Sequence, residues 1–112
     1  MVLPMRQNRN MDQSPVPPER CTNLDEIRAG MDAIDREMIA LMARRVAYVR
    51  AAAAFKTSSA NVAAPERVAA VLQTRRKWAE EAGLSGDVVE GLYRELVAYC
   101  VSEEHKQWVA TR

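Results

Sequence analysis

The sequence predicts an all-α protein with three helices, one very long and two of medium length. The main evidence is an apolar pattern from Leu24 to Phe55, which recurs at alternating steps of three and four residues, as along one face of a long helix. Two later stretches, residues 65–82 and 86–108, show the same helical spacing. We find no segment with the alternation of a β-strand and no internal repeat.

The first helix is expected to begin near Asn23, because Thr22 or Asn23 can cap its first turn and acidic residues follow. It continues to Lys56, which gives about 33 residues and a rod of roughly 50 Å. A single small domain cannot bury both ends of such a rod, so the pattern favours an extended bundle or a dimer. Its repeating face consists of Leu24, Ile27, Met31, Ile34, Met38, Leu41, Arg45, Tyr48, Ala52 and Phe55.

The later helices are bounded by turn and capping residues. The connection Thr57–Ala64 is small and polar, and we expect a flexible loop there. Pro65 suits the first position of the second helix, and Gly83 suits the residue that follows its end. Ser85 is the expected cap of the third helix.

The N-terminal residues 1–20 contain four prolines and no periodicity, which predicts a disordered tail before one helical domain at residues 21–112. Much of the apolar content of that domain is alanine. Such a thin core favours association of two chains, since a short helical chain buries little surface alone. We therefore expect a homodimer.

Composition excludes several classes of function. Sixteen basic and 15 acidic residues give a net charge of +1, which does not favour nucleic acid or anionic membranes as partners. Two cysteines and one histidine show no metal-ligand spacing, so no metal site is expected. The chain shows no apolar run typical of a signal peptide or a membrane span, and a cytoplasmic protein is the simplest interpretation.

Arg45 is a charged residue in an otherwise apolar face, where it is costly unless something pairs with it. Lys56 lies eleven residues later, about three helical turns, so the two side chains project from nearly the same side and could hold a small dianion between them. Arg28 is roughly 25 Å before Arg45 and about 100° around the helix. If Arg28 contributes to the same ligand site, it must come from another subunit.

Glu104 lies on the apolar stripe of the third helix, where burial favours the protonated form of a carboxyl group. Arg67 stands near the start of the second helix, directly after the flexible connection. Each charged residue also has a structural interpretation: Arg45 in a salt bridge, Lys56 at a helix C-terminus, Arg28 in solvent, and Glu104 as the partner of an arginine. The spacing alone leaves these alternatives open.

The joint pattern of Arg28, Arg45 and Lys56 on one long first helix resembles the all-helical chorismate mutase family. Within it, the chain is most similar to the isochorismate pyruvate lyase group of salicylate and pyochelin (siderophore) biosynthesis. The resemblance covers about residues 21–108. The stretches that carry it are CTNLDEIRAGMDAIDREM, RRVAYVRAAAAFK, APERVAAVL, RKWAEEAGL and VEGLY.

The resemblance implies an intertwined homodimer whose active site holds a substrate dicarboxylate between Arg45 and Lys56 of one chain and Arg28 of the other. It further implies that Arg67 contacts substrate and that the Thr57–Ala64 connection closes as a lid. The implied reaction is pericyclic and needs neither metal nor organic cofactor. Orientation of the substrate and stabilisation of the ether oxygen, a task for Lys56, would carry the catalysis.

Two positions depart from the family pattern. Glu104 stands where the salicylate-forming lyase and many mutases have glutamine, and a glutamate donates a hydrogen bond to the ether oxygen only when protonated. Val68 stands where the mutases usually have a glutamate that contacts the C4 hydroxyl of chorismate. Isochorismate carries its hydroxyl group at C2, so Val68 favours the lyase.

The leading hypothesis is a cofactor-free isochorismate pyruvate lyase that makes salicylate and pyruvate, with secondary chorismate mutase activity. The first alternative is a chorismate mutase that converts chorismate to prephenate. The second alternative is a helical dimerisation module without catalytic activity, in which Arg28, Arg45 and Lys56 would be incidental.

Overall fold

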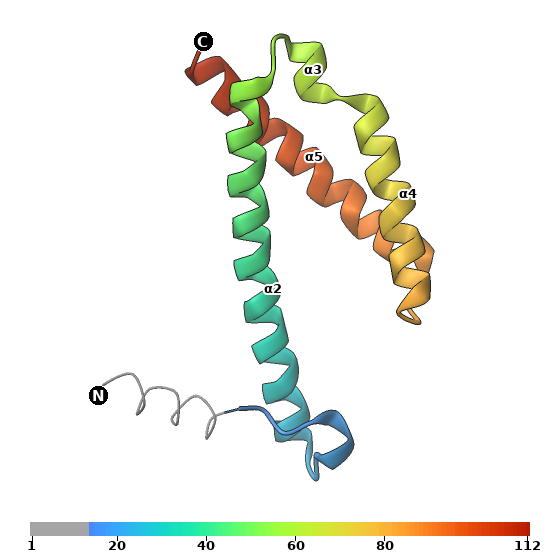
Figure 1. The fold of residues 1–112 in the computed structure, drawn as a ribbon. Coiled ribbons are helices and arrows are strands. Elements are labelled where there is room, and N and C mark those ends of the chain that lie inside the picture. Colours follow the sequence, from blue (N-terminus) through green and yellow to red (C-terminus); the bar gives the residue numbers. More distant parts are fainter. Residues whose placement is uncertain (1–13) are drawn as a thin grey trace, which may run out of the picture. The chain divides into compact units, whose positions relative to one another are not determined.

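A computed structural model describes residues 14–112, and it confirms the predicted all-α fold (Figure 1). No β-strand occurs among these residues. The elements in order are η1 (Pro18–Arg20), α2 (Leu24–Ala52), η2 (Ala53–Phe55), α3 (Ser59–Ala63), α4 (Pro65–Glu81) and α5 (Gly86–Ala110).

Residues 1–13 of the predicted tail lie outside the described residues, and the rest of that tail includes the short 3₁₀ turn η1. The chain divides into two compact units, one ending at Met42 and one comprising residues 43–112. The second unit contains the end of α2 and all later elements. Within the part of the chain that the structure describes, no helix is both long and apolar enough to cross a membrane.

The start of α2 is capped as the sequence predicts. The Asn23 Oδ1 atom accepts a hydrogen bond of 2.9 Å from the backbone N–H of Glu26. In return the Glu26 carboxylate accepts one of 2.8 Å from the backbone N–H of Thr22. The first bond satisfies an N–H group that a helix start leaves without an intrahelical partner, and the second holds the residue before the cap against the first turn.

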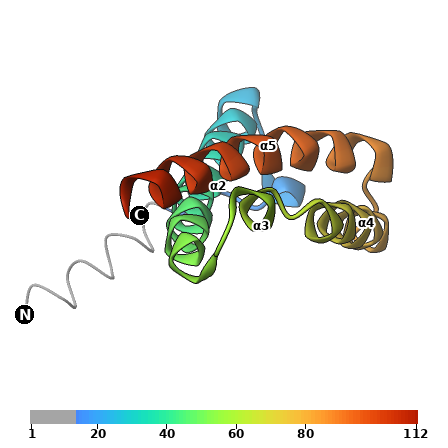
Figure 2. The same cartoon turned by 90° about the horizontal axis from the view of Figure 1, so that it is seen from above.

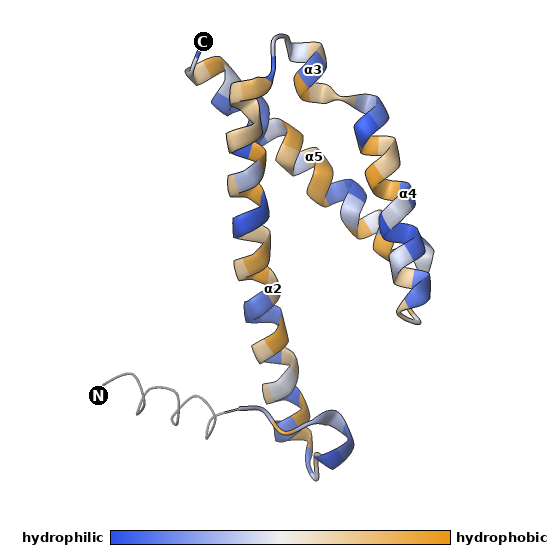
Figure 3. Ribbon diagram, in the orientation of Figure 1, coloured by the Kyte–Doolittle hydropathy of each residue, from blue (hydrophilic) through white to orange (hydrophobic). Residues whose placement is uncertain are grey.

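Apolar residues recur along the whole of α2, as Figure 3 shows, yet most of them are exposed in the single chain. Met31, Met38 and Met42 are not core residues of the single chain, since their exposed fractions are 53%, 51% and 39%. The other exposed large side chains of this helix are Leu24, Ile34, Ile39, Leu41 and Tyr48. Exposed apolar surface on this scale is typical of a face that another chain covers.

The end of α2 differs from the prediction. The α-helix stops at Ala52, η2 tightens the last turn, and Lys56 has an extended backbone with φ −97° and ψ 140°. Two contacts explain the early end: Ala53 is buried at 2% exposure, and the indole N–H of Trp108 donates to the Lys56 carbonyl over 3.1 Å. A carbonyl that accepts from a side chain needs no helical N–H partner.

The connection Thr57–Ala64 is not the irregular loop that its composition predicts, because it contains the short helix α3. Ser58 caps this helix by accepting a hydrogen bond from the backbone N–H of Asn61 over 3.2 Å. Val62, in the middle of α3, is buried at 2% exposure. One buried side chain and one cap therefore hold the segment as a helical turn.

Helices α4 and α5 agree with the predicted boundaries. Pro65 begins α4, Gly83 adopts a positive φ of 81° after its end, and the Ser85 hydroxyl caps α5 by accepting from the Val88 N–H. Within residues 43–112, α5 packs along α4, α3 and η2 (Figure 2). The buried apolar residues of this unit are Val46, Ala53, Val62, Val71, Leu72, Ala79, Val97 and Cys100.

An ion pair at the surface joins the last turns of α2 to α5. The Arg50 guanidinium donates to the Glu103 carboxylate over 2.6 Å, and Lys106 lies 3.2 Å from the other oxygen. The hydrogen bond from Arg50, followed by that from Lys106, holds the pKa of the Glu103 carboxyl below its ordinary value. Folding therefore favours the ionised form of Glu103.

This lowered pKa predicts a pH-dependent effect of Glu103→Gln on stability. A carboxyl with a lower pKa in the folded state stabilises the fold above its unfolded pKa of about 4.3, and that contribution is lost as the pH falls through the folded value. We expect wild type to exceed Glu103→Gln in free energy of unfolding at neutral pH, with a difference that shrinks in acid. Urea unfolding of both proteins from neutral to acidic pH measures this difference in the free energy of unfolding. The control is Glu95→Gln, an exposed position on α5, and a Glu103→Gln difference independent of pH contradicts the prediction.

Candidate functional site

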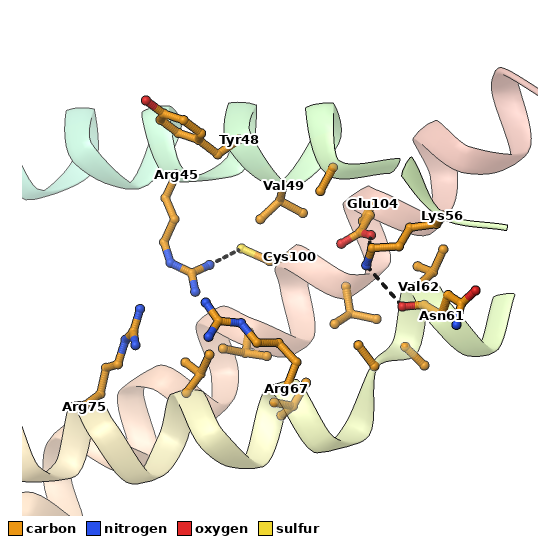
Figure 4. Close-up of a pocket in the computed structure, with 17 residues that line it drawn as sticks. Arg45, Tyr48, Val49, Lys56, Asn61, Val62, Arg67, Arg75, Cys100 and Glu104 are labelled. Carbon is orange, nitrogen blue, oxygen red and sulfur yellow. Dashed lines mark hydrogen bonds and ion pairs between the residues drawn. The ribbon is translucent and has the colours of Figure 1, made fainter. Parts of the chain in front are cut away.

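A cavity of about 700 Å³ lies within the second unit, and every residue that lines it falls between positions 45 and 104. Figure 4 shows the end of α2 on one side of it and α4 on the other, with α5 behind. Its walls are mainly small and branched apolar side chains, which suit the ring of an organic molecule. These are Val49, Ala52, Val62, Ala63, Ala64, Val68, Val71, Val97 and Val101.

Lys56 lies at one end of the cavity with its ammonium group held by two partners. The Nζ atom is 2.7 Å from Glu104 Oε2, and it donates to the backbone carbonyl of Asn61 over 3.1 Å. The Lys56 carbonyl is in turn the acceptor for Trp108. An ammonium group has three N–H donors, so one remains available to a ligand.

Glu104 is the one buried charged residue in the described part of the chain, with an exposed fraction of 7%. Its carboxylate points to the ammonium group of Lys56 at the same end of the cavity (Figure 4). The structural interpretation, that Glu104 pairs with an arginine, is not what the structure shows, because its partner is Lys56. The prediction that Glu104 shares the apolar stripe of the third helix is confirmed by its burial near Cys100 and Val97.

Arg45 extends from α2 into the cavity and is half-buried. Its Nη1 atom donates to the thiol of Cys100 over 3.1 Å, and its guanidinium carbon lies 6.0 Å from the centre of the Tyr93 ring. No described carboxylate lies within 4 Å of it, so these contacts place the group without neutralising its charge. A partly desolvated and unpaired guanidinium favours an anionic ligand.

Arg67 and Arg75, both on α4, line the same cavity. In Figure 4 their guanidinium groups point toward that of Arg45, away from Lys56 and Glu104. The sequence analysis named Arg67 but missed Arg75. The pattern that could have found it is helical, since Arg75 lies four residues after Val71 and eight after Arg67, close to the face they share.

Arg28 is the one predicted site residue that the structure does not bring to this cavity. It is an exposed residue of α2 in the first unit, whereas the cavity belongs entirely to the second. The structure therefore joins four predicted site residues, Arg45, Lys56, Arg67 and Glu104, in one place. The contribution of Arg28 to the site stays a prediction, and it requires a second chain.

The charges along the cavity define the kind of ligand it can hold. Four cationic side chains line it against one carboxylate, and that carboxylate is already paired with Lys56. Among the described residues, no group of three histidine, cysteine or acidic side chains could hold a metal ion. Apolar walls and surplus guanidinium groups are the features that suit a cavity to a small organic anion.

The chain belongs to the chorismate mutase type II family, whose pattern residues 27–105 match. It is 46% identical over 95 residues to the isochorismate pyruvate lyase of Pseudomonas aeruginosa, which covers 85% of this chain and 94% of that protein. It is also 36% identical over 84 residues to the T-protein of Haemophilus influenzae, covering 74% of this chain and 22% of that longer protein. The predicted family is confirmed, and with it the prediction that the chain is an enzyme.

Proposed function

We propose that this chain is an isochorismate pyruvate lyase that converts isochorismate to salicylate and pyruvate, with weaker chorismate mutase activity in the same cavity. The observation that supports this most is the cavity itself: a lysine and a buried carboxyl group at one end, and arginines without carboxylate partners at the other. The proposed substrate is a dicarboxylate with an enolpyruvyl ether, and its two negative charges match the excess of cationic side chains in the cavity. The similarity to the Pseudomonas aeruginosa lyase over most of both chains favours isochorismate.

The proposed reaction is a rearrangement of bonds within one molecule. The ether C–O bond of isochorismate breaks, one hydrogen passes from the ring to the methylene carbon of the enolpyruvyl group, and the ring becomes aromatic. Atoms and electrons balance without a nucleophile, an oxidant or a water molecule. The apolar walls would hold the enolpyruvyl group over the ring, which is catalysis by orientation.

Lys56 is the residue proposed to stabilise the ether oxygen as its bond to the ring breaks. Negative charge develops on that oxygen in the transition state, and a positioned ammonium donor stabilises it more than it stabilises the substrate. Two of the three N–H groups of Lys56 are directed to Glu104 and Asn61. These contacts fix the position of Nζ before substrate arrives.

A chorismate mutase is the second candidate, favoured by the family and by the similarity to the T-protein. Val68 counts against chorismate as the preferred substrate. It lines the cavity and offers no hydrogen bond to a ring hydroxyl. The role of Arg67 as a substrate contact is part of the proposal, supported by its place in the cavity.

We further propose that the active form is a homodimer in which Arg28 of one chain completes the site of the other. The exposed apolar residues of α2 support this, because a second chain would bury them. Ordinary helix geometry also separates Arg28 from Arg45 too far for both to serve one ligand in the same chain. The cytoplasmic location and the absence of nucleic-acid partners, cofactor and metal stay predictions.

The test of the proposed activity is turnover of isochorismate and chorismate in separate assays. We expect salicylate, followed by its fluorescence, to form from isochorismate faster than prephenate forms from chorismate. Lys56→Gln should lower kcat by on the order of 100-fold, since it removes a charged donor to the ether oxygen. Lys77→Gln, an exposed cation outside the cavity, is the control. Prephenate as the faster product would favour the mutase, and no turnover of either compound would favour a dimerisation module.

Glu104→Gln is expected to flatten the pH dependence of activity. A glutamine amide donates a hydrogen bond to the ether oxygen at every pH, whereas a carboxyl group donates only when protonated. In the free enzyme the Glu104 carboxylate is paired with Lys56, so the proposed role requires Glu104 to take up a proton when substrate binds. Wild-type kcat should then fall as the pH rises, and kcat of the variant should not. Glu103→Gln, at the neighbouring position outside the cavity, should keep the wild-type profile. Identical profiles for wild type and Glu104→Gln would contradict the proposed role.

Complementation between inactive variants tests the shared site. We expect Arg28→Ala and Lys56→Ala each to be inactive as homodimers but to recover activity when co-expressed. Random pairing makes half of the dimers mixed, each with one intact site, so about a quarter of wild-type activity should return. Arg45→Ala with Lys56→Ala is the matched control, because both changes fall in the same site. Recovery in the control, or none in the test pair, would contradict an Arg28 supplied by the partner.

A further inference from the structure

We propose that Arg75 is a further ligand-binding residue of the cavity and that, with Arg45, it binds the ring carboxylate of the substrate and of salicylate. The inference rests on the proposed function, since it assigns a residue to one group of the proposed substrate. Four observations support it: the position of Arg75, the aromatic rings around it, its unused donors, and its contrast with Arg76.

The position of Arg75 is at the end of the cavity opposite the Lys56–Glu104 pair. It lines the cavity from α4, and its guanidinium group points toward that of Arg45 in Figure 4. Cations that face each other repel unless an anion lies between them. Their convergence without a described carboxylate nearby is therefore the arrangement expected of an anion-binding position.

Aromatic rings hold Arg75 in place without neutralising it. Its guanidinium carbon lies 4.6 Å from the centre of the Trp78 ring and 5.8 Å from that of Tyr93. The same Tyr93 ring lies 6.0 Å from the guanidinium carbon of Arg45. Contact with an aromatic face is favourable for a cation and leaves N–H groups free to donate to a ligand that lies in the plane of the guanidinium.

The hydrogen bonds of Arg75 leave donors unused. Its Nη1 atom donates to the hydroxyl of Thr74 over 2.9 Å, while its Nε atom is buried without a hydrogen-bond partner among the described residues. A buried donor without a partner costs free energy. The Nη2 atom likewise donates to no described residue. A carboxylate at the outer, Nη1–Nη2 edge of the guanidinium would accept two parallel N–H···O bonds, which match its two oxygens.

The next residue shows what a structural arginine looks like on this helix. Arg76 reaches three carboxylates, Asp87 at 2.6 Å, Glu90 at 3.1 Å and Glu80 at 3.7 Å. The hydrogen bonds that Arg76 donates to Asp87 and Glu90 raise the pKa of its guanidinium group further. Arg75, one position earlier, forms no ion pair with any described carboxylate. The two arginines therefore have different roles, and Arg75 is the one that faces the cavity.

The ring carboxylate is the group that fits Arg75. If Lys56 binds the ether oxygen, the enolpyruvyl carboxylate stays close to Lys56, because one carbon joins it to that oxygen. The ring carboxylate is attached farther from the ether and can extend toward the arginines. After the reaction the ring carboxylate belongs to salicylate, and the other carboxylate belongs to pyruvate. Arg75 should therefore affect salicylate and leave pyruvate unaffected.

The experiment compares Arg75→Gln with wild type in turnover and in product binding. We expect KM for isochorismate to rise about tenfold or more, as for the loss of a charge-assisted hydrogen bond, with kcat changed less than about threefold. By calorimetry, the Kd of salicylate should rise about tenfold and that of pyruvate should stay unchanged. Arg75→Lys, which keeps the charge but loses the two parallel donors, should fall between wild type and Arg75→Gln.

Lys77→Gln, an exposed cation two residues away, controls for the loss of net charge and should bind salicylate as wild type does. An unchanged KM and salicylate Kd in Arg75→Gln would overturn the inference. If that variant does not fold, Arg75→Lys decides, and wild-type values there would overturn it. A wild type that makes neither salicylate nor prephenate would overturn the proposed function alone. The salicylate titrations would still test Arg75, and equal affinities, or no binding to wild type, would refute its role.

Discussion

The ion pair between Lys56 and Glu104 is the interaction on which the rest of this site depends. Glu104 is buried on α5, and a buried carboxylate is costly unless a partner reaches it. Lys56 can reach it because the chain leaves the α-helix at Ala52 and is tightened through η2. The hydrogen bond from Trp108 to the Lys56 carbonyl and the ion pair of Arg50 with Glu103 hold the same two segments together.

The cavity separates two electrostatic environments, and this division is what suits it to a dicarboxylate ether. At one end a cation and an anion already neutralise each other, so a neutral ether oxygen can bind there without a large desolvation cost. At the other end Arg45, Arg67 and Arg75 have no described carboxylate partner, so charge must come with the ligand. Binding energy gained at the charged end can then be used to orient the bonds that react at the other.

Much of the fold could be predicted from the sequence because its starts and stops are local. Asn23, Pro65, Gly83 and Ser85 each act within a few residues of their own position, and all four stand where they were expected. Four of the predicted site residues also meet in one cavity. Helical spacing accounts for Arg45 and Glu104, whereas Lys56 reaches the cavity from an extended backbone beyond the end of α2. Their catalytic and binding roles remain predictions.

The features that the sequence did not reveal depend on contacts between distant segments. The early end of α2 rests on Trp108, more than fifty residues away in the chain, and α3 rests on the burial of Val62 against α5. Arg75 is the first of three adjacent cations in the sequence. The carboxylate partners of Arg76 and the place of Arg75 in the cavity distinguish it from its neighbours. Local propensity cannot show which cation of such a run is left unpaired, because the carboxylates that decide it lie on another helix. Of the two cations that stay without an ion pair, Lys77 is exposed and Arg75 lines the cavity, so Arg75 is the one available to bind a ligand there.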